Sequence, residues 1–224
     1  DVVVVADRLM HWEATYYGSH AETAISQPST TWYFAEGASS GPFDLFYLLQ
    51  NPTEQVADVD IRFLRPHGAA PVTRTYHLTP RSRTTIYVDN DIEELRESEV
   101  SAQFTSTNGV PIIAERSMYF SSTLPFMGGH GSAGVTAPAK EWFLAEGATG
   151  SFFTMFVLIA NPTDQPATVE ATYLLDSGEP IVKTYTVNAN SRFNIYVNGE
   201  HARLANATVA SRYKSDVPII VERT

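Results

Sequence analysis

The strongest constraint on the fold is an internal repeat of about 110 residues. The sequence TWYFAEGA at residues 31–38 returns as EWFLAEGA at 141–148, an offset of 110. VPIIAER at residues 110–116 returns as VPIIVER at 217–223, an offset of 107. Because the matched segments keep their order and the offset drifts by only three residues, the chain contains two copies of one domain.

Within each copy, short runs rich in β-branched and aromatic residues are separated by turn signals. VDIRF at 59–63 alternates apolar and polar residues, as half-buried strands do. The NPT segments at 51–53 and 161–163 favour turns, since proline presets φ. Helix is expected only for a turn or two near 91–97 and 200–204. The pattern predicts an all-β chain of two tandem immunoglobulin-like β-sandwich domains.

The repeat also predicts the domain boundaries. We expect one sandwich at residues 31–121, a second at 141–224 and an ordered linker at 122–140. A third copy of the closing motif, VVADR at 4–8, opens the chain. Residues 1–13 are therefore expected to be the last strand of a preceding repeat, which lacks its partner strand here. Such a strand must pair with a neighbouring chain or another sheet edge, because its backbone groups need hydrogen-bond partners.

Composition excludes several classes of protein. The formal net charge is −10, and an acidic surface repels phosphate backbones, so nucleic acid is not an expected partner. The chain has no cysteine, which removes disulfides, thiolate nucleophiles and cysteine-based zinc sites. The longest apolar runs fall far short of the roughly 20 residues that a membrane-spanning helix needs.

Charged residues that recur in both copies are the first candidates for a site. Glu36 matches Glu146, and Arg116 matches Arg223. An unpaired carboxylate on an apolar strand is costly to bury. We therefore predict two structural ion pairs, Glu36 with Arg116 and Glu146 with Arg223, each joining the first and last strands of a sandwich.

A catalytic alternative uses the same strands. Glu115 and Glu222 are also repeated, and paired carboxylates would suit a glycosidase. Consecutive Glu and Arg residues in a strand point to opposite faces, so only one of each can face the core. The acidic run at 89–94 offers oxygen ligands for calcium, but its counterpart at 198–201 keeps few of the acids. We expect no catalytic, metal or cofactor site.

Two aromatic and two histidine residues recur as well. Trp32 and Trp142 are predicted to fill the sandwich cores, the alternative being a platform for a sugar ring. His20 and His130 match across copies in the expected linker, where we predict a structural hydrogen-bonding role. A zinc site would need further ligands, and neither a His-x-His pair nor a His-Glu-x-x-His motif is present.

These motifs resemble the sensory rhodopsin transducer family. The resemblance rests on WFLAEG at 142–147, NPTDQPA at 161–167, SR at 191–192 and VPIIVER at 217–223. It implies a β-sandwich that is often oligomeric and is similar in shape to carbohydrate-binding modules. The family's signalling role is not expected to transfer, because a transducer is a single domain and this chain is an array.

The tandem arrangement also resembles the Trp-Tyr-Phe-Ala-Glu-Gly repeats of large bacterial surface proteins. The shared features are ERSMYF at 115–120 and GGH at 128–130. We therefore expect a non-catalytic structural repeat of an extracellular or cell-surface array, such as a stalk, fibre or coat. Its expected partners are copies of itself or neighbouring repeats, joined by strand exchange. The alternative is a carbohydrate-binding module of a surface protein, with glycans as partners.

Overall fold

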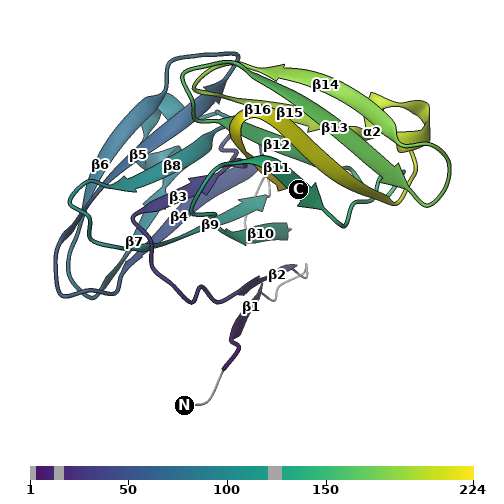
Figure 1. Cartoon of the computed structure of the whole chain (residues 1–224). Helices are drawn as coiled ribbons and strands as arrows, with labels where there is room; N and C mark the ends of the chain where they lie inside the picture. The colour runs from purple at the N-terminus through teal and green to yellow at the C-terminus, as the bar shows by residue number, and fades with distance from the viewer. Residues whose placement is uncertain (1–3, 13–17, 121–127) are drawn as a thin grey trace.

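The chain is all-β, as predicted, and folds into two sandwiches that lie side by side (Figure 1). The computed structural model describes residues 4–12, 18–120 and 128–224. Nearly every element is an antiparallel strand, because the short alternating segments each present one apolar face.

The first sandwich, which we call repeat 1, consists of two four-stranded layers around a buried apolar core. One layer contains β3 (Thr31–Phe34), β8 (Ser101–Ser106), β5 (Ala57–Pro66) and β6 (Val72–Leu78). The other contains β10 (Gly128–Ala133), β9 (Ile113–Phe120), β4 (Phe43–Asn51) and β7 (Ser82–Tyr87). Two short helical segments follow β7, namely α1 (Val88–Asp91) and η1 (Glu93–Leu95).

Repeat 2 reproduces this plan, with one long strand shared by its two layers. Residues 209–215 of that strand pair with β13 and residues 220–223 pair with β12. The strands are β11 (Ala139–Leu144), β12 (Phe156–Asn161), β13 (Ala167–Leu175), β14 (Ile181–Val187), β15 (Ser191–Tyr196) and β16 (Val209–Arg223). The short helices α2 (Val197–Glu200) and η2 (Ala202–Leu204) follow β15.

The segment expected to be a linker is mostly strand. Residues 128–133 form β10 and pair with β9, and β11 already begins at Ala139. Within the described part of the expected linker at 122–140, only residues 134–138 lie between strands. The rest of that prediction, residues 122–127, lies outside the described residues. The prediction of a linker was wrong because glycines are typical of loops. Here they lie on β10 and allow neighbouring side chains to pack closely against this strand.

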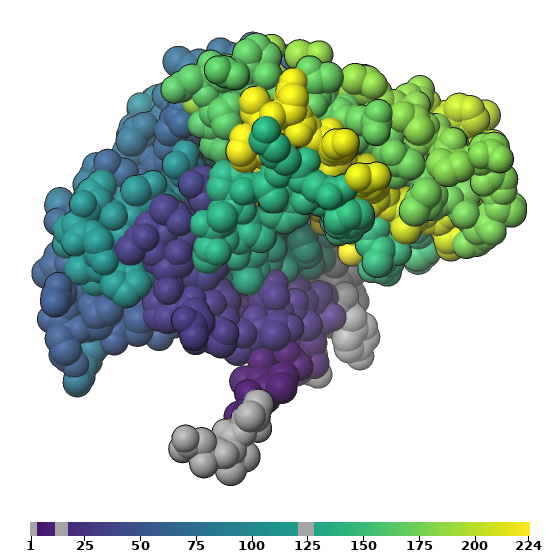
Figure 2. Space-filling view, in the orientation of Figure 1, coloured from purple at the N-terminus to yellow at the C-terminus, as the bar shows by residue number. Residues whose placement is uncertain are grey.

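The N-terminal segment is a hairpin rather than a lone strand. β1 (Asp7–Trp12) pairs with β2 (Gly18–Thr23), so the expectation that this strand lacks a partner was wrong for residues 7–12. Residues 1–3 and 13 lie outside the described residues. Met10 stands opposite His20 in the same register as Met118 opposite His130 in the β9–β10 hairpin. The hairpin projects below repeat 1 in Figures 1 and 2. It repeats the closing hairpin of a sandwich.

The two repeats share a buried interface. Apolar side chains from both repeats form a separate cluster there: Ala35, Leu64, Leu158, Ala160 and Ile220. Beside it, β15 pairs in parallel with β5, with Ser191 opposite Arg65, so the sheet runs from one repeat into the other. A strand pairing fixes both distance and register. The repeats therefore meet at one defined angle.

A buried asparagine anchors the same turn in each repeat. The side chain of Asn51 is fully buried, and its Nδ2 donates to the carbonyl oxygens of Gln55, Leu78 and Thr79 at 2.7–3.1 Å. Its Oδ1 accepts from the backbone N and hydroxyl of Thr53. Asn161 makes the corresponding five hydrogen bonds in repeat 2. The repeated NPT turn is thus held by its asparagine as well as by its proline.

Replacing Asn161 with Ala is expected to destabilise the protein by about 2–4 kcal/mol, because buried backbone carbonyls lose their donors. Chemical denaturation monitored by circular dichroism measures the change. The matched control is Asn90→Ala, since Asn90 is exposed and should change stability by less than about 0.5 kcal/mol. Equal effects of the two substitutions would contradict the assignment.

Candidate functional site

A buried cluster of charges joins the two repeats. Arg116 lies on β9 and is fully buried, with Nη2 2.7 Å from Glu36 Oε2. Its Nη1 lies 2.6 Å from Glu222 Oε2 of repeat 2 and also donates to the backbone carbonyl of Glu36 at 2.9 Å. Glu222 in turn accepts from the backbone N of Glu36 at 2.9 Å. The predicted pair Glu36–Arg116 is therefore part of a contact between repeats as well as within one.

Both partners in the cluster are held in their charged forms. Burial alone would raise the pKa of Glu36, but Arg116 and His130 outweigh it and hold the pKa at about 2. Burial likewise opposes the charge on Arg116, but Glu222 and Glu36 together raise its pKa above the ordinary value. The arginine is thus matched by two carboxylates in a site that excludes water.

A second arginine crosses the interface in the opposite direction. Arg192 of β15 is buried, and its Nη1 donates to the carbonyl oxygens of Gly37 at 2.6 Å and Val100 at 2.9 Å in repeat 1. Its Nη2 donates to Asn194 Oδ1 at 2.6 Å, which holds the guanidinium in place. Burial lowers the pKa of Arg192, and the carboxylates of Glu99 and Glu36 offset that effect only in part.

The two predicted histidines lie on strands and take part in the same region. His130 is on β10, with Nδ1 3.1 Å from both Glu36 Oε2 and Arg116 Nη2. His20 is on β2, is 7% exposed, and its Nε2 lies 3.2 Å from the hydroxyl of Tyr119. Burial lowers the pKa of His20, and Arg8 and His130 lower it further. Each histidine thus lies within hydrogen-bond distance of another side chain, on a strand and not in the expected linker.

The cross-repeat ion pair occurs twice. Arg8 of the β1–β2 hairpin pairs with Glu115 of repeat 1. Arg8 and Arg116 occupy matching positions in the closing motif, and so do Glu115 and Glu222. The pair Arg116–Glu222 therefore repeats the pair Arg8–Glu115. The same contact recurs at successive junctions along the chain.

The second predicted pair has a different environment. Arg223 Nη2 lies 3.1 Å from Glu146 Oε2, but the Glu146 side chain is 83% exposed and that of Arg223 is 36% exposed. In the described part of the chain, no further repeat covers this pair as repeat 2 covers Glu36 and Arg116. Burial of these charges depends on the neighbouring repeat.

Both predicted core tryptophans pack inward. Trp32 is 2% exposed, and its Nε1 donates to the carbonyl of Ile112 at 2.9 Å. Trp142 is half-buried against the core of repeat 2 and donates to the carbonyl of Ile219 at 2.9 Å.

The residues considered for catalysis or for metal binding make other contacts in the described part of the chain. Glu115 and Glu222 are each paired with an arginine across a junction. In the acidic segment, Asp89 accepts from the backbone N of Leu45 and Asp91 accepts from that of Tyr87. Burial raises the pKa of Asp89 to about 6. Among the described residues, no three His, Asp or Glu side chains are grouped to hold a metal ion.

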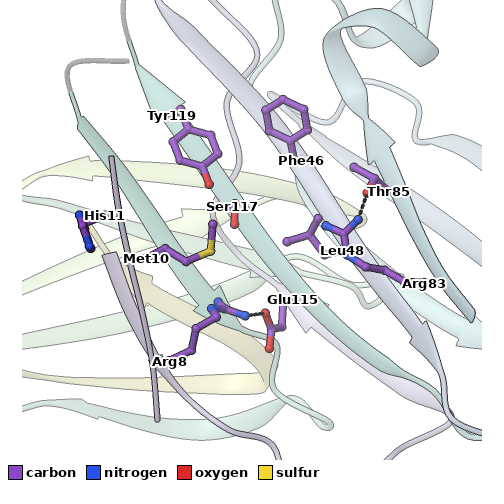
Figure 3. Close-up of a pocket in the computed structure, with 10 residues that line it drawn as sticks. All are labelled: Arg8, Met10, His11, Phe46, Leu48, Arg83, Thr85, Glu115, Ser117 and Tyr119. Atoms are coloured by element: carbon purple, nitrogen blue, oxygen red, sulfur yellow. Dashed lines mark hydrogen bonds and ion pairs between the residues drawn. The ribbon is translucent and has the colours of Figure 1, made fainter. Parts of the chain in front are cut away.

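An apolar hollow lies on the outer face of repeat 1. Arg8 and Met10 of β1 form one wall, and Phe46, Leu48 and Arg83 form the floor and the other wall (Figure 3). The lining also includes His11, Thr85, Glu115, Ser117 and Tyr119. Arg83 Nη1 donates to Thr85 Oγ1 at 2.8 Å.

Sequence reasoning did not find two residues of the cluster in their actual roles. Glu222 was considered only as a catalytic carboxylate, and Arg192 appeared only as part of a repeated motif. The signal was present, since each recurs in both copies at a strand position. Their partners lie in the neighbouring repeat, however, and a sequence pattern does not show which face that repeat covers.

Solved structures that are similar to this chain include those of two bacterial proteins. Anabaena sensory rhodopsin transducer matches with 27% identity and a TM-score of 0.35, covering 40% of this chain and 91% of that chain. A crystal structure of Thermotoga maritima 1070 matches with 16% identity and a TM-score of 0.44, covering 49% of this chain and 96% of that one. No protein-family model and no curated protein matches the sequence. None of the described helices is long and apolar enough to span a membrane.

Replacing Glu36 with Gln is expected to destabilise the protein by about 3 kcal/mol, because it leaves Arg116 buried with less compensation. The matched control is Glu146→Gln, which removes the corresponding but exposed carboxylate and should cost less than about 0.5 kcal/mol. Urea denaturation of both variants measures the difference. Similar losses for the two would show that repeat 2 does not bury the first pair.

The pH dependence of stability should carry the signature of Glu36. Its pKa in the folded protein is about 2, below the ordinary value of 4.5, so the carboxylate stabilises the fold above pH 4.5. That contribution, on the order of 3 kcal/mol, is lost as the pH falls from 4.5 toward 2. Denaturation at a series of pH values should show a shallower loss in Glu36→Gln. An unchanged slope in that variant would rule out Glu36 as the source.

Proposed function

We propose that this chain is a non-catalytic structural repeat of an array at the cell surface or outside the cell. The observation that carries the proposal is the junction between repeats. It combines the buried Glu36–Arg116–Glu222 cluster, the two carbonyl contacts of Arg192 and the parallel pairing of β15 with β5. A junction of this kind sets the angle between successive modules.

The repeated ion pair supports an array over an isolated pair of domains. The ion pair Arg8–Glu115 matches the ion pair Arg116–Glu222. The same kind of contact therefore occurs at both ends of repeat 1. In repeat proteins, stability is a sum of the modules and of the interfaces between neighbours. Modules that share a fixed interface form a stiff element, which suits a stalk, fibre or coat.

The partners in this proposal are neighbouring repeats and other copies of the chain, joined by strand exchange. The resemblance to the tandem repeats of bacterial surface proteins supports this assignment, and each repeat is proposed to be a relative of the sensory rhodopsin transducer family. The net charge of −10 disfavours nucleic acid as a partner.

A carbohydrate-binding module is the second candidate. The hollow beside Arg83 offers apolar and polar side chains on an open surface, and it is the one specific feature in favour of sugar binding. Small-ligand sites usually combine apolar walls with a few placed polar groups. A glycan array is expected to be negative. Saturable binding that Arg83→Ala abolishes would favour the carbohydrate reading instead.

Small-angle X-ray scattering tests the structural role. A four-repeat protein, made by joining residues 1–223 of one copy to residues 9–224 of a second so that the closing motif occurs once, should give a maximum dimension that grows linearly with repeat number at a constant cross-section. The fixed junction predicts this, whereas flexibly linked domains follow a square-root law. A variant in which Glu36, Arg116 and Glu222 are all replaced by Met removes the ion cluster without leaving an unpaired buried carboxylate, and it serves as the control. A flexible chain of independent domains in the unmodified protein would reject the proposal.

A further inference from the structure

The junction between the repeats has two halves, and the chain carries a second example of each, one partly covered by β1 and the other exposed. In repeat 2, the outer face of β12, β15 and β16 rests on repeat 1. The matching face of repeat 1, which we call the docking face, contains Phe46, Leu48, Arg83, Thr85 and Glu115. This face is the hollow of Figure 3.

The docking face is already arranged like its covered counterpart. Arg83 matches Arg192, and each guanidinium donates to the side chain two residues later, at 2.8 Å to Thr85 and 2.6 Å to Asn194. Arg192 is 3% exposed beneath repeat 1, whereas Arg83 is exposed. Arg83 is therefore positioned to donate to the backbone carbonyls of another repeat.

The opposite half lies at the end of repeat 2, which we call the docking end: Phe143, Ala145, Glu146, Leu174 and Arg223. The matching residues of repeat 1 are buried at the junction. Leu64 is 1% exposed, whereas Leu174 is 46% exposed, and Phe143 is 68% exposed where repeat 1 has the half-buried Tyr33. Repeat 1 thus buries apolar surface and an ion pair that are exposed at the matching positions of repeat 2.

A strand edge is also open at repeat 2. In repeat 1, β4 begins at Phe43, and residues 43–45 pair with residues 118–120 of β9. The matching residues 153–155 of repeat 2 precede β12, and among the described residues they have no partner strand. Met10 and His11 of β1 occupy the positions of Met118 and Tyr119 in the repeated motif. The β1–β2 hairpin therefore matches the strand that this edge lacks.

We propose that the docking end of repeat 2 binds the docking face of a further repeat of this kind, for which the N-terminal part of a second copy of this chain stands in. The docking face of the incoming copy covers the docking end, its Glu115 meets Arg223, and its β1 pairs along residues 153–155. The inference rests on the proposed structural function, since it names the partner of the same junction. The contact joins different surfaces of the two copies, so it extends into a filament and does not close as a dimer.

The overlap between the two copies is short. Residues 4–8 of the incoming copy match residues 219–223 of the accepting copy. The two segments therefore compete for the same place beside β12 of the accepting copy, where residues 220–223 already pair. Residues 4–6 belong to no strand, and Val4 and Val5 are about 80% exposed. Residues 4–8 of the incoming copy are therefore the segment that is displaced. Arg223 of the accepting copy then takes the place of Arg8 beside Glu115 of the incoming copy.

A charge exchange tests the docking directly. Sedimentation of the full chain should show a mass that rises with concentration above 24.7 kDa. Arg223→Glu alone and Glu115→Arg alone should each weaken association by about thirtyfold or more, because a close charge pair becomes repulsive. An equimolar mixture of the two variants should recover association, since each junction then joins opposite charges. Association that neither variant changes would overturn the proposal.

Cysteine pairing gives a second readout that does not depend on charge. The chain has no cysteine, so a mixture of Thr154→Cys and His11→Cys chains contains only the introduced thiols. These positions match Asp44 and Tyr119, which stand directly opposite each other in repeat 1. The mixture should form a disulfide-linked pair under mild oxidation. Thr79→Cys mixed with His11→Cys is the control, and equal yields from the two mixtures would overturn the proposal.

The two proposals can fail separately. A chain that stays at 24.7 kDa at every concentration, with no cross-link above the control, would reject docking between copies. The stiffness of the joined four-repeat protein would be untouched by that result. Binding of a glycan to the docking face, with no self-association, would likewise overturn the docking proposal.

Discussion

The arrangement of the two repeats depends on the guanidinium of Arg116. It lies fully buried between a carboxylate of its own repeat, Glu36, and one of the next, Glu222. Removing one carboxylate partner from a buried arginine strongly destabilises a protein. Repeat 1 therefore presents its charge in a form that only a neighbouring repeat completes. The apolar cluster around Leu64 and Leu158 and the β5–β15 pairing exclude water from the same place.

This dependence makes the junction selective. Buried ion pairs add little net stability compared with apolar residues of the same volume, but a wrong partner leaves a charge uncompensated. At the docking end, the matching charges Glu146 and Arg223 stay exposed and cost little. Matching residues are thus solvated where no repeat covers them and selective where one does.

The sequence predicted the all-β fold and most strand positions, because alternation and turn residues are local signals. It placed Glu36 and Arg116 together because unpaired buried charges are costly. It could not place Glu222 or Arg192, whose partners belong to the neighbouring repeat, nor distinguish the buried pair from the exposed pair Glu146–Arg223. The glycines near His130 are typical of a linker, but in the structure they lie on β10. Phe120 packs closely on Gly128, and His20 packs closely on Gly131.

Calorimetry offers the most direct test of the central claim that the junction makes the two repeats one cooperative unit. Thermal unfolding of the chain at neutral pH should give a single transition whose calorimetric and van't Hoff enthalpies agree. In Glu222→Ala, which removes only the contribution of repeat 2 to the cluster, the transition should broaden or separate into two. Two independent transitions in the unmodified protein, unaffected by Glu222→Ala, would contradict the account.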